Sequence, residues 1–293
     1  MKKVVIEQAG SYEKLKLKEF PDPRPGKGEV LIETRACGVN FADCIVRMGL
    51  YSSAKEFVGW PITPGFEVSG VVTALGDGAT KFSLGQKVMA VTLFGGYTTH
   101  SVVPEDRVFS LIEGLDFAQA AAMPAVFLTA YYALFELAHP RKSDFMLVHS
   151  AAGGVGSTLV QLGRLAGCHV VGVVGSATKV DYVKSLGANA VIDKSTQDLW
   201  KAAEKCTPGG YDLILDANGV ETLDQSYQHL SNGGKLVVYG FHSMFSKGRG
   251  KPDWLKLLWD YWRTPRFNPL QMTKGNHSVL AFNLSYMFGK KRF

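Results

Sequence analysis

The stretch from Asp144 to Arg164 constrains the fold of this chain more than any other. It opens with an apolar run, continues through three closely spaced glycines and ends in apolar residues at helical spacing. This order predicts a strand, a tight turn and a helix. A pyrophosphate binds to free backbone N–H groups at a helix N-terminus, and glycine lets it approach the main chain. The stretch therefore predicts a dinucleotide site formed by Gly153, Gly154, Val155 and Gly156.

Apolar runs and helical patterns alternate on both sides of this turn. The runs FMLVHS, HVVGVV, ANAVID, DLILDA and KLVVYG predict five strands. The segments between them predict helices near 157–166, 178–186, 196–206 and 221–230. Strands that alternate with helices in this way are typical of a parallel, doubly wound sheet. The predicted fold class is therefore α/β, with a Rossmann dinucleotide-binding domain.

The end of the second strand indicates which dinucleotide binds. An NAD site usually offers a carboxylate there to the ribose 2′-OH, but this chain has Gly175, Ser176 and Lys179 instead. A hydroxyl and a lysine suit a 2′-phosphate, which a carboxylate would repel. Lys194, after the third strand, can reach the same region in this fold. These residues predict NADPH as the cofactor, although a surface lysine is often merely solvated.

Two further contacts are expected where the later strands end. Ligands of such sheets bind beyond the carboxyl ends of the strands, which points to Asn218 and Gly240. Asn218 could equally cap the helix that begins near Glu221. His242 is a lone histidine without a visible partner, so we do not assign it a role as general base. The chain also lacks the GxSxG pattern of a serine nucleophile.

Composition excludes several other classes of protein. The chain has 293 residues, which is enough for two domains. Its net charge of +6 is spread along the chain, and no recognition motif for nucleic acid is present in the sequence. Its four cysteines lack CxxC spacing, which favours a reduced interior over disulfides or a zinc knuckle. No apolar run approaches 18 residues and the N-terminus lacks a signal sequence. We therefore expect a cytoplasmic protein.

The first part of the chain has a different pattern. Up to about residue 116, short β segments separated by turns predict a small, partly closed β-barrel. A helical pattern from about Phe117 to Glu136 then leads into the strand–helix repeats. The expected division is a barrel domain at 1–118 and a dinucleotide-binding domain at 119–293.

Four motifs, in the same order, resemble those of a known family. They are GVNFAD at 38–43, PGFE at 64–67, GGY at 95–97 and the strand–turn–helix stretch at 144–164. Together they resemble the quinone oxidoreductase branch of the medium-chain dehydrogenase/reductase superfamily. The resemblance implies a GroES-like first domain and places Thr129 near the nicotinamide amide. The alternative for Thr129 is a helical threonine bonded back to its own turn.

The resemblance also bears on metal chemistry. In the related zinc alcohol dehydrogenases, the positions that match Asn40 and Phe66 carry a cysteine and a histidine that bind zinc. Neither an amide nor a phenyl ring replaces such ligands, and the cysteines of a structural zinc site are missing too. We therefore expect no metal. The carbonyl of the substrate must then be polarised by hydrogen bonds, for which Asn40 is the first candidate and Tyr51 the second.

The segment 246–266 is rich in tryptophan and in basic residues. Its helical pattern places Trp254, Leu255, Leu258 and Trp262 on one face, amid a local excess of four positive charges. Such a helix can lie in a membrane interface. It can equally pack its aromatic face on the domain or over the cleft. The insertion resembles the vesicle amine transport protein homologue branch of the quinone oxidoreductases, whose members are membrane-associated in places.

The end of the chain carries two further expectations. Residues 278–284, SVLAFNL, predict a sixth strand, which in the family lies at the sheet edge, pairs with its copy in a homodimer and brings Phe282 towards the nicotinamide. Family chains continue beyond this point and return to the first domain, whereas this one stops at Phe293. We therefore expect a barrel without its closing strands and a catalytic activity that the truncation affects.

These observations lead to one functional hypothesis and one alternative. The hypothesis is a zinc-independent, NADPH-dependent oxidoreductase that transfers hydride to a quinone or an α,β-unsaturated carbonyl compound. The alternative is an NADPH-binding protein that acts at a membrane interface or in protein interactions, with little or no catalysis. Its basis is the tryptophan-rich segment together with the missing C-terminal part.

Overall fold

The computed structural model describes residues 1–245 and 250–289. It consists of two compact units. The first contains Met1–Ala125 and, among the described later residues, 250–252 and 285–289; the second contains 126–245 and Asp253–Leu284. The expected division after residue 118 falls inside a helix of the first unit, Phe117–Ala121.

The first unit is built on an antiparallel sheet that curls into half a barrel. Its strand order is β6-β3-β4-β5-β7, and a separate hairpin joins β1 to β2. The strands are β1 (Lys2–Val5), β2 (Lys16–Glu19), β3 (Glu29–Cys37), β4 (Glu67–Leu75), β5 (Lys87–Val91), β6 (His100–Pro104) and β7 (Val108–Ser110). Alternate residues of these strands, such as Val30, Ile32 and Val68, form a buried core inside the curl. The partly closed barrel expected from the sequence is thus present.

Short helices follow the motifs of the first unit. They are α1 (Phe41–Arg47), α2 (Ser52–Phe57) and α3 (Phe117–Ala121). Asn40 is the N-cap residue of α1, and Tyr51 holds the same position in α2. Both proposed catalytic residues therefore lie at helix starts, where the backbone is extended and the side chain is not part of the helical surface.

The second unit contains a six-stranded parallel sheet of order β10-β9-β8-β11-β12-β13. Its strands are β8 (Phe145–Val148), β9 (His169–Val174), β10 (Ala190–Asp193), β11 (Tyr211–Asp216), β12 (Leu230–Val238) and β13 (Ser278–Ala281). Numbered along the chain, this order is 3-2-1-4-5-6, which is that of a dinucleotide-binding sheet with its switch point between the first and fourth strands. The predicted doubly wound α/β fold is confirmed.

The helices of this unit depart from their expected bounds at several ends. They are α4 (Pro124–Tyr131, two residues of which belong to the first unit), α5 (Gly154–Leu165), α6 (Val180–Ser185), α7 (Leu199–Cys206), α8 (Leu223–Gln228), α9 (Trp254–Arg263) and α10 (Pro269–Gly275). α5 begins three residues earlier than expected, because the glycines themselves enter the helix. α7 begins three residues later, because Asp198 caps it by accepting hydrogen bonds from the amides of Trp200 and Lys201.

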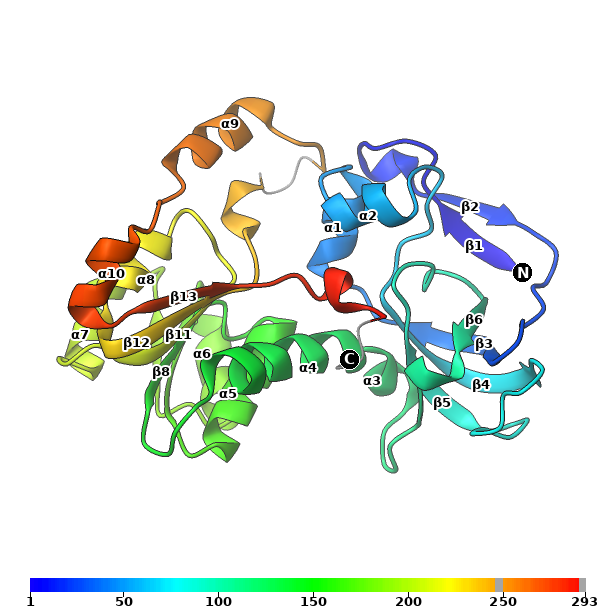
Figure 1. Ribbon diagram of the computed structural model, residues 1–293, viewed down its shortest axis with the longest axis horizontal. Coiled ribbons are helices and arrows are strands. Elements are labelled where there is room, and N and C mark those ends of the chain that lie inside the picture. The colour runs from blue at the N-terminus through cyan, green and yellow to red at the C-terminus, as the bar shows by residue number, and fades with distance from the viewer. Residues whose placement is uncertain (246–249, 290–293) are drawn as a thin grey trace. The chain divides into compact units, whose positions relative to one another are not determined.

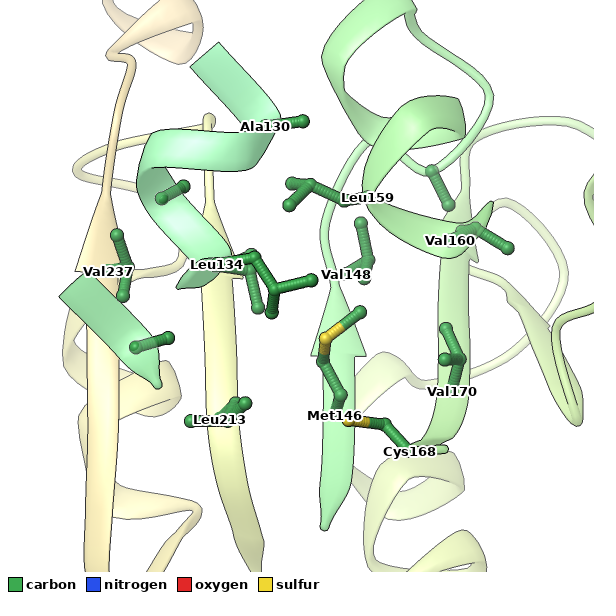
Figure 2. Close-up of a cluster of buried hydrophobic side chains, with 14 of the residues drawn as sticks. Ala130, Leu134, Met146, Val148, Leu159, Val160, Cys168, Val170, Leu213 and Val237 are labelled. Carbon is green, nitrogen blue, oxygen red and sulfur yellow. The ribbon is translucent and has the colours of Figure 1, made fainter. Parts of the chain in front are cut away.

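The helix expected at 117–136 is wrong as a single element. It is divided into α3, α4 and a π-helix at Tyr132–Ala138. The division between α3 and α4 occurs at Pro124, which lacks an N–H and cannot continue a helix. Ala130 and Leu134 from the later pieces lie beside α5 over the sheet, in one buried cluster with Val148 of β8, Leu213 of β11 and Val237 of β12 (Figure 2).

The helix α10 and the strand β13 lie beside β12. β13 pairs with it in parallel at the edge of the sheet, where it is the red strand of Figure 1. The sixth strand is therefore present but ends at Ala281, not at residue 284, because Leu284–Met287 forms a 3-10 helix. In residues 1–245 and 250–289, no helix combines the length and apolar character that a membrane span requires.

Candidate functional site

A buried carboxylate joins three of the motifs in the first unit. Asp43 lies in the first turn of α1 and is 6% exposed. Its carboxylate accepts hydrogen bonds from the Asn40 amide (2.8 Å), the Gly65 amide (2.8 Å) and the Tyr97 hydroxyl (3.0 Å). GVNFAD, PGFE and GGY, which are distant in sequence, therefore meet at one side chain.

A second buried carboxylate holds the side chain of Asn40. Glu67, at the start of β4, is 1% exposed, and its Oε1 accepts a hydrogen bond from Nδ2 of Asn40 at 2.7 Å. Its Oε2 accepts from the backbone amide of Ala125 at 2.7 Å. A carboxylate can only accept, so it fixes which end of the Asn40 amide faces it. The carboxamide nitrogen retains a second N–H that can be donated to a ligand.

Burial sets the electrostatics of this cluster. It raises the pKa of Asp43 and of Glu67, although the hydrogen bonds that each accepts act in the opposite direction. Burial and the nearby Asp43 also raise the pKa of Tyr97, so its hydroxyl is a hydrogen-bond donor at neutral pH. The cluster therefore orients amide and hydroxyl groups and does not present an evident proton donor to a substrate.

Aromatic side chains line the other side of PGFE. Tyr51 contacts the rings of Phe66 and Phe94 edge-on, with centroids 5.8 and 6.3 Å apart, and its hydroxyl lies 3.0 Å from the Ser285 hydroxyl. Asn40 and Tyr51 are thus connected through neighbouring residues of one motif, since Phe66 packs on Tyr51 and Glu67 bonds to Asn40. Apolar and aromatic surface next to a few oriented polar groups is typical of a site for a small organic molecule.

The glycine turn of the second unit has two kinds of glycine. Gly153 and Gly154 are exposed at the start of α5, whereas Gly156 is buried. A Cβ on Gly156 would lie 2.2 Å from the carbonyl oxygen of Ser150, so no side chain fits between helix and turn. The amides of the first helical turn, which include that of Val155, have no carbonyl partner within the helix and can bind an anion.

The ends of β8 and β11 are tied together at this edge of the sheet. Ser150 adopts a left-handed backbone conformation, with φ of 52°, and its hydroxyl donates to Oδ1 of Asn218 at 2.9 Å. Asn218 therefore does not cap α8, whose N-cap residue is Thr222. Gly240 lies alongside, and a Cβ there would be 2.9 Å from the carbonyl oxygen of Ala217. Asn218 thus contacts Ser150, next to the glycine turn, and Gly240 lies against Ala217, which directly precedes Asn218.

The residues expected to bind a 2′-phosphate gather at the ends of β9 and β10. Gly175 and Lys179 are exposed, and the Ser176 hydroxyl lies 2.9 Å from that of Thr178 in the turn that follows β9. The side chain of Lys194 reaches this turn, since its Cε lies 3.9 Å from the position of a Cβ on Gly175. The turn from Gly175 to Lys179 holds no carboxylate, whereas Asp193, the last residue of β10, precedes Lys194 and accepts hydrogen bonds from Ser195.

The other expected residues have structural surroundings. Thr129 lies in α4, half-buried, while Phe282 packs against Tyr132 with ring centroids 4.9 Å apart. His242 contacts the carbonyl oxygen of Ala217 through both its amide and Nδ1, which is a role in the loop. Lys247 and Arg249 of the tryptophan-rich segment lie outside the described residues.

Sequence reasoning missed three residues that hold these sites together. Glu67, Ser150 and Asp216 make hydrogen bonds on which the positions of Asn40 and Asn218 depend. A weak signal existed, because Glu67 and Ser150 lie within motifs and Asp216 lies at a strand end. Whether such a side chain points inward depends on tertiary packing, which the spacing of residues does not show.

Comparison with known proteins identifies the family. Residues 26–114 match the model of the alcohol dehydrogenase GroES-like domain, and residues 154–257 match that of the zinc-binding dehydrogenases. The synaptic vesicle membrane protein VAT-1 homolog of Rattus norvegicus is 34% identical over 98% of this chain and 70% of its own length. The chain belongs to the medium-chain dehydrogenase/reductase superfamily, in the quinone oxidoreductase branch near VAT-1. A quinone oxidoreductase of the same organism is also 34% identical, over 82% of this chain and 73% of its own.

Solved structures agree with this assignment. The human VAT-1 homolog-like protein aligns with a TM-score of 0.80 at 29% identity, over 100% of this chain and 81% of its own. The Escherichia coli quinone oxidoreductase in complex with NADPH aligns with a TM-score of 0.83 at 26% identity, over 99% and 83%. The chain therefore has the fold of an oxidoreductase family.

One of the matching family models is described as that of a zinc-binding dehydrogenase, but the residues at the expected ligand positions of this chain, Asn40 and Phe66, are not zinc ligands. Nδ2 of Asn40 donates a hydrogen bond to Glu67, and the ring of Phe66 packs against the rings of Tyr51 and Phe94. Among the described residues, no three His, Cys, Asp or Glu side chains are grouped to hold a metal ion. The donor set in the first unit is one of amides, hydroxyls and carboxylates.

Proposed function

We propose that this protein is an NADPH-dependent oxidoreductase that reduces a quinone or an α,β-unsaturated carbonyl compound without a metal. The observation that carries the proposal is the pair of sites described above. One is a glycine turn with a hydroxyl and two lysines near the end of the second strand, and the other is an oriented carboxamide beside aromatic rings. NADPH complexes of related quinone oxidoreductases support the choice of cofactor.

The residues of the second unit fit NADPH. The exposed glycines at the start of α5 leave backbone amides free for the pyrophosphate. Ser176, Lys179 and Lys194 would hold the 2′-phosphate, because hydroxyl and ammonium groups donate hydrogen bonds to it and the turn after β9 holds no carboxylate. When bound, NADPH supplies the hydride.

The residues of the first unit would prepare the acceptor. The free N–H of Asn40 donates to the carbonyl oxygen of the substrate, on which negative charge develops as hydride arrives. Glu67 holds the carboxamide in the donating orientation, and Asp43 fixes the loop that carries it. Tyr51 and Phe66 provide an apolar wall for the ring of a quinone or the chain of an enone. No group in this cluster is an evident acid at neutral pH, so water delivers the proton.

Nucleotide titration followed by turnover tests this function. NADPH should bind more tightly than NADH, and NADPH oxidation should depend on added quinone or enone. Asn40→Ala should lower kcat/KM by about 10²- to 10³-fold, as expected for the loss of one donor to a developing oxyanion.

Asn232→Ala is the matched control, because Asn232 is exposed on β12. It should leave kcat/KM unchanged. Equal affinity for NADH and NADPH, or an Asn40→Ala protein with full activity, would contradict the proposal.

We also propose that the protein is a homodimer through β13. This strand is paired on one side, with β12, and ends the sheet order of the described residues. An open strand edge presents unpaired N–H and C=O groups, which a second copy can satisfy across a two-fold axis.

A second candidate function is peripheral binding to membranes, and the exposure of α9 favours it. Six of its apolar and aromatic residues are between 57% and 83% exposed, namely Trp254, Leu255, Leu258, Trp259, Tyr261 and Trp262. The helix faces its own unit with a polar side, where Lys256 binds Asp260 and the carbonyl oxygen of Ser243. The alternative, in which the aromatic face of this helix packs on its own domain, does not match the exposure of these residues on the second unit. Arg263 and Arg266, in the same unit, add exposed positive charge.

Co-sedimentation with vesicles tests this candidate. The wild-type protein should sediment with vesicles that contain anionic lipid and less so with neutral ones, because both apolar burial and charge contribute. The double variant Trp254→Ser, Trp262→Ser should lose at least about tenfold in affinity, since an interfacial helix binds through its buried apolar area. Trp200→Phe, in α7, is the control. Binding that survives the double variant would contradict a role for α9, and vesicle binding without any turnover would favour the interaction function over the enzyme.

A further inference from the structure

The last residue of β11 is a fully buried carboxylate with four hydrogen-bond donors. Oδ1 of Asp216 accepts from the amides of Asn218 (2.7 Å) and Gly219 (3.1 Å). Oδ2 accepts from the hydroxyls of Thr222 (2.7 Å) and Ser226 (3.0 Å). All four donors belong to the nine residues 218–226, so the carboxylate folds the segment that follows β11 back onto the strand end.

The loop that Asp216 holds contacts both of its neighbours at this edge of the sheet. On one side, Asn218 accepts the Ser150 hydroxyl and so joins the glycine turn. On the other, the carbonyl oxygens of Ala217 and Asn218 accept the amides of His242 (3.2 Å) and Ser243 (2.9 Å) from the loop after β12. A shift of this loop would therefore displace the ends of three adjacent strands together.

A neutral histidine lies beneath the carboxylate. Nε2 of His149 is 3.0 Å from the Ser226 hydroxyl and 3.7 Å from Asp216. Ser226 gives its one hydrogen to Asp216, so His149 is the donor in the other contact. Burial lowers the pKa of His149, although the charge of Asp216 opposes this effect. The negative charge of Asp216 is thus directed to the loop amides rather than neutralised by an imidazolium.

We propose that Asp216 is a positioning residue for the half of the dinucleotide that binds beyond β11 and β12. It acts through the amides of Asn218 and Gly219, which set the loop against Ser150 and the glycine turn. This inference rests on the proposed function, since it concerns the same cofactor. The two mononucleotide halves of such a sheet lie on either side of its switch point. The 2′-phosphate end, at β9 and β10, is therefore independent of Asp216.

This division gives a selective test with two ligands. NADPH spans both halves of the site, whereas 2′,5′-ADP carries the 2′-phosphate half without the nicotinamide. In calorimetric titrations, Asp216→Asn should raise the dissociation constant of NADPH at least about tenfold, as expected for the loss of a hydrogen bond to a charged group. The dissociation constant of 2′,5′-ADP should change by no more than about twofold, because its 2′-phosphate binds at β9 and β10 and only its 5′-phosphate meets the glycine turn.

The same strand offers a matched control. Asp212, near the opposite end of β11, accepts the amide of Phe145 (2.8 Å) and the hydroxyl of Ser231 (2.8 Å). Asp212→Asn makes the same substitution at a partly buried aspartate that accepts two hydrogen bonds away from the cofactor edge, so both ligands should bind as to the wild type. Hydrogen exchange should be faster at the amides of Asn218 and Gly219 in Asp216→Asn and unchanged there in Asp212→Asn.

A milder variant covers the case in which Asp216→Asn does not fold. Thr222→Val is nearly isosteric and removes one donor to Asp216. It should weaken NADPH about threefold, which is the effect of one ordinary hydrogen bond, and leave 2′,5′-ADP unchanged. Equal losses for both ligands, an unaltered NADPH affinity in the substituted proteins, or an equal effect of Asp212→Asn would overturn the inference. A wild-type protein that binds neither ligand would instead overturn the proposed function.

Discussion

At the scale of single residues, buried carboxylates organise both candidate sites. Asp43 and Glu67 in the first unit and Asp216 in the second are each almost completely inaccessible. Isolated burial of a carboxylate is costly, so each is compensated by several donors. Those donors are backbone amides and polar side chains, and they include groups of the two proposed functional residues Asn40 and Asn218. The carboxylates therefore determine where Asn40 and Asn218 lie, although none was chosen as a functional residue from the sequence.

His149 gives a prediction on pH. Burial lowers its pKa in the folded state, so the unfolded chain binds a proton that the folded chain does not. The stabilisation is complete above the unfolded pKa of about 6.5 and is lost as the pH falls below it. In His149→Gln, which does not titrate, the free energy of unfolding should fall less between pH 7 and 5. One such group changes this free energy by at most about 1.4 kcal/mol per pH unit.

Denaturant unfolding of both proteins at several pH values measures this difference. Asp43 and Glu67 have raised pKa values and contribute with the opposite sign, but they are common to both proteins and cancel. Near pH 8 the difference in free energy of unfolding between the two proteins should no longer change with pH. Curves that remain parallel down to pH 5 would show that His149 is not held neutral.

At the scale of elements, the turn between β8 and α5 depends on one close approach. A Cβ on Gly156 would be 2.2 Å from the carbonyl oxygen and 2.8 Å from the carbonyl carbon of Ser150. Both are backbone atoms, so the turn or the helix must move.

The helix α9 depends on a different kind of contact. A buried acidic residue, Asp260, fixes its polar side and leaves its aromatic side exposed.

Gly156→Ala should therefore destabilise the protein by about 1–3 kcal/mol, which is the usual cost of overpacking a close contact. Gly209→Ala is the control, since a Cβ there meets nothing within 4 Å and its backbone is not left-handed. Thermal unfolding measures both. A Gly156→Ala protein as stable as the control would mean that the turn adapts without strain.

At the scale of the whole molecule, the open edge of the parallel sheet predicts the oligomeric state. The amide of Phe282 donates to the carbonyl oxygen of Val238, towards β12. Successive amides of a strand alternate in direction, so the amide of Ala281 points away from β12. Ala281 is also exposed. It is the position at which a second copy would add to the sheet.

Ala281→Pro removes this outward amide without removing an inward one. In sedimentation velocity, the wild type should sediment as a dimer and Ala281→Pro mainly as a monomer, because proline cannot donate across the edge. Ala281→Ser retains the amide and should stay dimeric. A wild type that is monomeric at micromolar concentration, or a proline variant that is still dimeric, would exclude this interface.

The sequence alone determined the sheet and the position of the glycine turn. Apolar runs such as Phe145–Val148 are local patterns, and their alternation with helices allows few topologies. Only the tertiary structure decided which side chains point inward. It separated Gly156, which packs against Ser150, from Gly153, which stays exposed, and it turned the aromatic side of α9 outward. It also brought Asp43 to Gly65 and Tyr97, because contacts between segments distant in sequence depend on how the strands and loops of the first unit pack, and no local pattern encodes that.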